Sequence, residues 1–228
     1  MKRRALLSLA LATAFAGAAR AQVPPSPGEV AAYQGLHAAA QRGDVAAIAR
    51  LLKSGAAIEA TDGAGRTPLH VATFARQREA VRALLQAGAN HAALEHGRYD
   101  AVTIAAVADD EDTLRLLLAG GASAKLVTSR YDGTALIAAA HLGHEGVVRQ
   151  LIAAGAPLDH VNNLHWTAAI ESVVLGDGGP RHQATLQALI DAGANLQLTD
   201  RSGHTPLALA RSRGHAAMVA MLEKAGAR

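Results

Sequence analysis

The chain has 228 residues, of which half are hydrophobic and only 3% are aromatic, and it contains no cysteine. The lack of cysteine excludes disulfide scaffolds, thiol nucleophiles and cysteine-based zinc sites. The formal net charge is +3, but residues 1–21 hold four basic and no acidic side chains, so the rest of the chain has 18 Lys and Arg against 19 Asp and Glu. Because nucleic-acid binding depends on clustered positive charge, we expect no nucleic-acid partner.

The first 21 residues have the three parts of a secretory signal peptide. Three basic residues at positions 2–4 precede an apolar run at 5–18, and Ala-Arg-Ala at 19–21 has the small-x-small form of a cleavage site. The run is shorter than the roughly 20 apolar residues of a spanning helix, although a retained anchor is the alternative. We therefore predict export to the periplasm and no membrane insertion after cleavage. The paired arginines leave both the general secretory and the twin-arginine routes open.

The next segment, residues 22–32, is rich in proline and glycine. Both residue types interrupt regular helices. We therefore predict a flexible linker here, with no helix of its own.

From residue 33 to residue 228 the chain repeats one phrase six times. The clearest copy is Asp-Gly-Ala-Gly-Arg-Thr-Pro-Leu-His-Val-Ala at 62–72, followed by Leu-Leu-Gln-Ala-Gly-Ala at 84–89. The copies are 33 or 34 residues apart, except that the fifth is about five residues longer. A fixed period of this size predicts a stacked array of small supersecondary units. The predicted units are 33–61, 62–94, 95–127, 128–160, 161–198 and 199–228.

Each unit has the signals of a helix, a turn, a second helix and a loop. Thr67-Pro68 is a helix start, in which Thr accepts hydrogen bonds from free N–H groups and Pro occupies the first helical position. His70 stands where its ring can reach back to the cap, as in a capping box. Units one and three lack Thr-Pro, so we expect weaker caps there. The second helix ends in each unit at a glycine, where a left-handed residue is favoured: Gly55, Gly88, Gly121, Gly155, Gly193 and Gly226.

The phrase Asp-x-x-Gly-x-Thr-Pro-Leu-His-x-Ala, followed by Leu-Leu-x-x-Gly-Ala, resembles the ankyrin repeat. The resemblance covers residues 33–228 and implies an all-α solenoid of paired antiparallel helices joined by hairpin-like loops. It also implies protein binding through the loop tips and the inner helices. Terminal units of such arrays face water, which fits the polar Glu223 at a position that is apolar in the other units.

One position varies where the phrase is otherwise regular: the residue before each helix-capping position. We call this set the column, and it consists of Tyr33, Arg66, Tyr99, Gly133, Trp166 and His204. Tyr, Trp and Arg are the side chains that most often anchor protein interfaces. With neighbours that the resemblance places on the exposed inner face or the loops, the predicted protein-binding residues are Arg66, Phe74, Tyr99, Tyr131, His141, Asn163, Leu164, Trp166, Arg201 and His204. Packing of these rings against adjacent loops is the alternative.

Two further segments depart from the phrase. The insertion in the fifth unit, Gly176–His182, has the Gly and Pro of a turn, and we predict a loop between the two helices that contacts a partner. The acidic run at 109–112 is interpreted as a solvated turn that starts a helix. His141 and His144, and His160 and His165 beside Asp159, form incomplete ligand sets, so no metal site is predicted.

No catalytic or cofactor-binding motif is present: neither a Gly-x-Ser-x-Gly elbow nor a His-Glu-x-x-His or dinucleotide fingerprint. The sequence therefore predicts a monomeric, non-catalytic protein-binding module without a cofactor. It would act in the periplasm as a scaffold, regulator or accessory factor for another exported protein. A secreted effector that binds a foreign protein and, less favoured, a metal-dependent enzyme are the alternatives.

Overall fold

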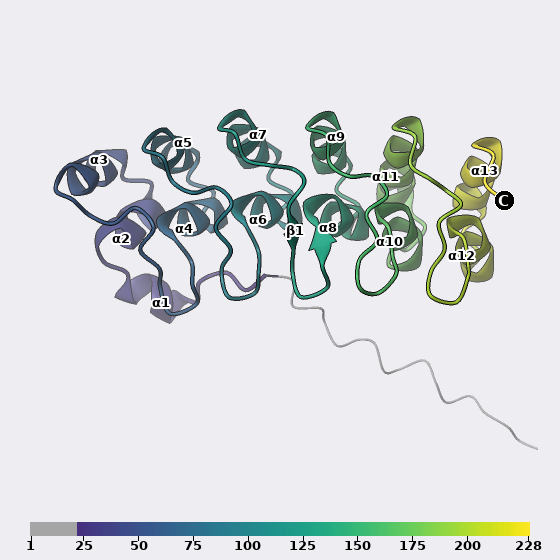
Figure 1. Cartoon of the computed structure of the whole chain (residues 1–228), viewed down its shortest axis with the longest axis horizontal. Helices are drawn as coiled ribbons and strands as arrows, with labels where there is room; N and C mark the ends of the chain where they lie inside the picture. Colours follow the sequence, from purple (N-terminus) through teal and green to yellow (C-terminus); the bar gives the residue numbers. More distant parts are fainter. Residues whose placement is uncertain (1–21) are drawn as a thin grey trace, which may run out of the picture.

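The structure is a computed structural model that describes residues 22–228; the predicted signal peptide lies outside the described residues. Six helix pairs stack side by side in two parallel rows (Figure 1). Each helix packs mainly against its neighbours in the same row and its partner within the unit, and α11 (Pro180–Asp191) also packs against α8 (Ala135–Leu142) of the other row. The expected all-α solenoid of six units is confirmed.

The inner row consists of the first helix of each unit: α2 (Gly35–Arg42), α4 (Pro68–Phe74), α6 (Ala101–Val107), α8 (Ala135–Leu142), α10 (Ala168–Val174) and α12 (Pro206–Arg213). The outer row consists of the second helix of each unit: α3 (Val45–Lys53), α5 (Arg78–Gln86), α7 (Glu111–Ala119), α9 (Glu145–Ala153), α11 (Pro180–Asp191) and α13 (Ala216–Lys224). No helix in the described part of the chain is long and apolar enough to cross a membrane.

Hairpin loops connect successive units and project below the inner row in Figure 1. Only one contains paired strands, β1 (Val127–Thr128) and β2 (Gly133–Thr134), which are antiparallel. Backbone hydrogen bonds join the hairpins of units two to five, from the amides of His96, Ser129 and Asn163 to the carbonyls of Ala64, Arg98 and Tyr131 at 2.8–3.0 Å, and the Arg201 side chain joins the hairpin of unit six to Asn163. The loops therefore form a continuous surface that is held in register.

The helix caps explain why the phrase folds in this way. Thr67 and His70 form the predicted capping box, with the ring Nδ1 of His70 3.0 Å from the amide nitrogen of Thr67. Gln34 gives α2 no side-chain cap, as expected. The expectation of a weak cap in unit three is wrong, because Asp100 accepts a hydrogen bond from the amide of Thr103 at 2.9 Å. A short carboxylate caps a helix as well as a threonine does.

The core is a continuous layer of small and aliphatic side chains between the two rows. The equivalent inner-helix positions are all buried: Leu36, Leu69, Val102, Leu136, Ala169 and Leu207. Alanine on both rows lets the helices approach closely, and leucine and valine fill the space between units. The array therefore needs no large aromatic core.

The prediction of a helix-free linker at residues 22–32 is wrong. Residues Pro27–Ala32 form helix α1, which Ser26 caps. Ser26 and Glu29 make a reciprocal capping box, and Pro27 occupies the first helical position, where its missing N–H has no cost. We call residues 22–32 the strap, because they extend from α1 toward β1 at the level of the hairpin loops (Figure 1).

The insertion of the fifth unit is only partly a loop. Helix α11 begins at Pro180 and has 12 residues, whereas the other outer helices have nine. The prediction that all of Gly176–His182 lies between the helices is therefore wrong for Pro180, Arg181 and His182, which belong to the first turn of α11. A proline at the first helical position explains why the helix starts early.

Candidate protein-binding surface

The column residues lie at the end of the hairpin loops, directly before the inner helices. In four of the loops the same backbone bond closes the hairpin; in unit two it joins the amide of Asp62 to the carbonyl of Arg66 at 3.0 Å. In three of these loops an Asp or Asn side chain also accepts two amide hydrogens of the loop, as Asp62 does from Ala64 and Arg66 at 2.9 Å. In unit three Glu95 accepts the amide of Tyr99 instead, at 3.2 Å. The local sequence thus fixes the backbone at these four column positions.

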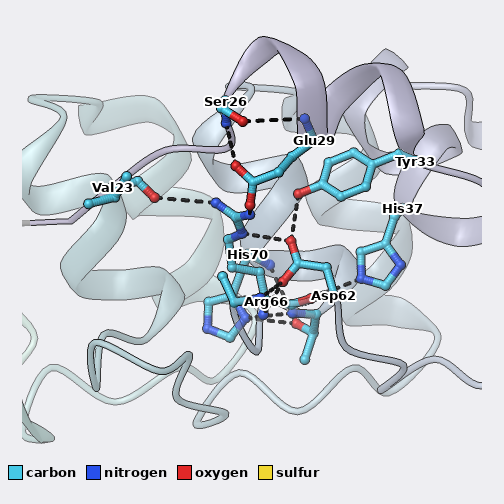
Figure 2. A network of polar contacts seen from close by, with 10 residues as sticks. Val23, Ser26, Glu29, Tyr33, His37, Asp62, Arg66 and His70 are labelled. Atoms are coloured by element: carbon cyan, nitrogen blue, oxygen red, sulfur yellow. Dashed lines mark hydrogen bonds and ion pairs between the residues drawn. The ribbon is translucent and has the colours of Figure 1, made fainter.

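The strap covers the first half of the column. Arg66 is only 2% exposed, and its guanidinium contacts the carboxylate of Glu29 and the carbonyl of Val23 in the strap (Figure 2). The remaining guanidinium nitrogen, Nε, donates to Asp62 Oδ2 at 2.7 Å. The same Oδ2 accepts the hydroxyl of Tyr33 at 2.7 Å. The sequence placed Arg66 on an exposed surface, and this is wrong because the strap buries it.

The charges of this network stabilise one another. Burial alone would raise the pKa of Asp62, but hydrogen bonds from Tyr33 and Arg66 outweigh it and hold that pKa at about 2. Hydrogen bonds from Ser26 lower the pKa of Glu29, and Arg66 adds to this effect. Burial and the bond to Asp62 raise the pKa of the Tyr33 hydroxyl. At neutral pH one guanidinium therefore lies between two carboxylates.

Tyr99 is the third column residue and is also buried, with 8% of its surface exposed. Burial raises the pKa of its hydroxyl, and Arg130 and the backbone of Gln22 oppose this rise. The strap runs from α1 toward β1 at the level of the hairpin loops (Figure 1). The prediction that Tyr99 is exposed for a partner is wrong, because its side chain is buried.

In the second half of the column, which we call the open half, His204 is exposed and Trp166 is half-buried, whereas Gly133 is buried in β2. Exposed apolar side chains lie on the same hairpins. We call the exposed apolar side chains of the hairpins of units three to five the hairpin strip; each is 38–43% exposed. They are Leu94, Val127, Tyr131, Val161 and Leu164. Two of them, Tyr131 and Leu164, are predicted site residues. Trp166 of the column, on the same hairpin as Leu164, is half-buried.

Polar contacts join the predicted residues of these hairpins. The side-chain amide of Asn163 donates to the carbonyl of Arg130 at 3.0 Å, and its backbone amide donates to the carbonyl of Tyr131 at 2.9 Å. Arg201 donates to the carbonyl of Asn163 at 2.8 Å. His204, which is exposed, lies 3.4 Å from Asp200 Oδ2. The structure thus brings Tyr131, Asn163 and Arg201 together across units four to six.

Comparison with known proteins identifies the architecture. The model of the family described as ankyrin repeats (3 copies) matches residues 27–95 and 102–200. The chain belongs to the ankyrin repeat family. YahD of Escherichia coli (strain K12), an ankyrin repeat protein by name, is 36% identical over 190 residues, which are 83% of this chain and 94% of YahD.

Solved ankyrin structures agree over most of the chain. An ankyrin repeat domain from Acinetobacter baumannii AYE is 42% identical with a TM-score of 0.80, covering 85% of this chain and 98% of that domain. The ankyrin repeat domain of Bcl-3, a member of the IkappaB protein family, is 29% identical with a TM-score of 0.77, covering 86% and 87%. Ankyrin repeats are protein–protein interaction modules and are typically non-catalytic.

The two remaining predicted residues lie on the inner helices of this ankyrin array. Phe74 ends α4 and is half-buried. His141, in the last turn of α8, lies with its Nδ1 3.3 Å from Glu171 Oε2. Glu171 is 4% exposed and accepts a hydrogen bond from Asn162 at 3.1 Å. The sequence analysis missed Glu171, which stands where unit two has the buried Val71.

Residues of the insertion contact other units of the ankyrin array. Arg181 donates to Asp109 Oδ2 at 3.0 Å, so that unit five reaches unit three across unit four. His182 lies with Nε2 3.0 Å from the carbonyl of His141. The acidic run is also less solvated than predicted: Asp110 is 3% exposed, caps α7 and pairs with Arg78 at 3.2 Å. Arg181 is 64% exposed despite its pair with Asp109, so it remains accessible to a partner together with the tip of the insertion.

The histidines mostly have structural roles. His70 Nε2 lies 3.0 Å from the carbonyl of Ala93, and His144 Nδ1 lies 2.9 Å from the carbonyl of Ala106. His215 precedes α13 and makes no cap through its side chain. Between residues 22 and 228, no three His, Cys, Asp or Glu side chains gather in a way that would hold a metal ion.

Proposed function

We propose that this ankyrin array is exported to the periplasm and binds another exported protein, without catalysis, as a scaffold, regulator or accessory factor. The secretory pattern of residues 1–21 supports export. The observation that carries the binding proposal is the hairpin strip. Five of the eight exposed large apolar side chains in the described residues lie on three successive hairpins.

Exposed apolar side chains that gather on one part of a surface mark interaction sites more often than scattered ones do. The strip lies beside the open half of the column, which adds Trp166 as a half-buried anchor. The hairpins are held in register by backbone hydrogen bonds such as that from Asn163 to Tyr131. A surface that is already ordered loses little conformational entropy on binding.

The test is affinity capture from the periplasmic extract of the source bacterium. The bait is the mature chain, compared with its Tyr131→Ser/Leu164→Ser variant; both side chains are 38% exposed, so the fold should be kept. Val45→Ser is the matched control, because Val45 is also 38% exposed but lies on the outer helix α3. We expect the double variant to lose the captured protein at least tenfold and the control to retain it.

Equal capture by the double variant and the control would remove the hairpin strip from the binding surface. Fractionation of the producing cells tests the location. A mature chain beginning at Gln22 in the periplasmic fraction supports the proposal. The same chain found mainly in the culture medium would favour the alternative role of a secreted effector.

A further inference from the structure

The strap is held to the array by few contacts of its own. No residue of α1 is buried, and Val23 is 59% exposed. The polar contacts that join it to the array are the two from Arg66, to Glu29 and to the carbonyl of Val23. Pro25 and Val30 are the apolar strap residues that are half-buried. Opening the strap would expose little apolar surface of the strap itself beyond these two side chains, so the hydrophobic effect resists it only weakly.

The site beneath the strap is, in contrast, built by the array. Asp62 is fixed by the backbone of its own hairpin and holds the Nε edge of the Arg66 guanidinium. The two terminal nitrogens of Arg66 are directed at the strap (Figure 2). If the strap left, those nitrogens would lose a carboxylate and a carbonyl. An arginine fork that presents two donors matches a carboxylate well.

The strap holds the Glu29 carboxylate against Arg66 in a fixed geometry. One oxygen of Glu29 accepts the amide of Ser26 at 2.8 Å and closes the capping box, and the other contacts Arg66. The residues before it, Gln-Val-Pro-Pro at 22–25, are non-helical, and Ser26 itself has an extended backbone with φ −67° and ψ 158°. The array thus recognises an extended segment that leads into a capped helical turn with an acidic third residue.

We propose that the Arg66 site is a second partner-binding site of this surface, that the strap occupies it as an internal ligand, and that an acidic extended segment of the partner protein displaces the strap. This inference rests on the proposed protein-binding function and extends it from the open to the covered half of the column. When the strap departs, the Arg66 guanidinium loses its carboxylate partner. Charge complementarity therefore selects an acidic segment as the new occupant of the site.

The test uses a peptide of the strap sequence, residues 22–33, carrying a fluorophore at its C-terminus. It is titrated against the mature chain and against its Glu29→Gln variant, in which the internal strap loses its ionic contact. The control is Glu79→Gln, because Glu79 is 71% exposed and meets only Arg82 on its own helix. A strap tethered to its site competes at an effective concentration near the millimolar range.

We expect Glu29→Gln to bind the peptide at least tenfold more tightly than the unaltered chain and the Glu79→Gln control do. A peptide with Gln in place of its Glu should bind the variant at least tenfold more weakly. Hydrogen exchange at residues 27–32 should also be faster in the variant. Ser26→Ala, which removes only the capping box, should give an intermediate effect and provides a second route if Glu29→Gln fails to fold.

Three results would overturn the proposal. The first is equal affinity of the peptide for the variant, the control and the unaltered chain. The second is unchanged hydrogen exchange at residues 27–32, which would make the strap a fixed part of the fold. The third is a dimer of the unaltered mature chain by light scattering that Glu29→Gln abolishes, which would make the strap of a second copy the occupant. None of these results depends on the hairpin strip, so they leave the test of the proposed function untouched.

Discussion

The substitution Asp62→Asn measures how strongly the array depends on the network around Arg66. Asp62 Oδ1 accepts two backbone amides at 2.9 Å, and an asparagine can keep both, as Asn162 does at the equivalent position of unit five. Oδ2 accepts the Tyr33 hydroxyl and Arg66 Nε, both at 2.7 Å. The amide nitrogen of asparagine would face these donors instead, and Arg66 would keep only the strap as partner.

The pKa of Asp62 gives the expected magnitude. A fall from the ordinary value of 3.8 to about 2 corresponds to about 2 kcal/mol of stabilisation of the ionised form. The side chain is only 9% exposed, so screening by solvent reduces this figure little. We therefore expect Asp62→Asn to lower the free energy of unfolding by about 2 kcal/mol at pH 7, measured by urea denaturation with circular dichroism.

The pH dependence gives a second, independent check. Because the folded pKa of Asp62 is below its unfolded value, the stabilisation is present above about pH 4 to 5 and is lost as pH falls toward 2. The difference between the unaltered chain and Asp62→Asn should therefore shrink steadily below pH 4. Other acidic groups titrate in both proteins and largely cancel in this difference.

Asp200→Asn is the matched control. Asp200 accepts the same two loop amides, from Ser202 at 2.8 Å and His204 at 2.9 Å, but its second oxygen faces only the exposed ring of His204. We expect its substitution to cost less than about 0.5 kcal/mol. If Asp62→Asn costs no more than Asp200→Asn, or its cost is the same at pH 7 and pH 3, the reasoning about the network is wrong.

Two further changes test the packing of the array. Gly65 and Gly203 both have a φ near +80°, but a Cβ on Gly65 would lie 2.6 Å from the His96 ring, whereas Gly203 has nothing within 4 Å. Gly203→Ala should lower the free energy of unfolding by about 1 kcal/mol, because alanine disfavours the left-handed backbone, and Gly65→Ala should lower it distinctly more. Equal losses of stability in thermal denaturation of the two variants would contradict this. Arg181→Ala removes a pair with Asp109 in which both side chains are at least 42% exposed, so urea unfolding should change by less than about 1 kcal/mol; a loss above 2 kcal/mol would show that the insertion clamps units three to five together.

The sequence predicts the solenoid well because its determinants are local. A cap such as that of Thr67 involves residues three positions apart, and the repeated phrase places the same apolar positions in every unit. The strap illustrates the limit of local reasoning. Ser26-Pro27-Gly28-Glu29 contains a capping-box pattern, which the surrounding proline and glycine residues obscure.

The binding surface was harder to predict because exposure depends on distant contacts. Arg66 and Trp166 occupy equivalent column positions, and nothing in the phrase distinguishes their surroundings. Arg66 is buried because Glu29, 37 positions away in the sequence, covers it. Trp166 has no such cover from the strap, which ends at unit three. The column was therefore a sound guide to position but not to accessibility.

The two halves of the column differ in the kind of binding that they can support. Partner binding through each half should therefore depend differently on salt concentration. Contacts on the hairpin strip are apolar, so partner affinity through Tyr131 and Leu164 should change little with ionic strength. Displacement at Arg66 exchanges one carboxylate for another, and the approach of an acidic segment is screened over about 10 Å at 0.1 M salt. A partner that uses both halves should therefore associate more slowly at high salt while it dissociates at a similar rate. Association and dissociation rates at 50 and 500 mM NaCl measure this, and rates that do not depend on salt would confine the partner to the open half.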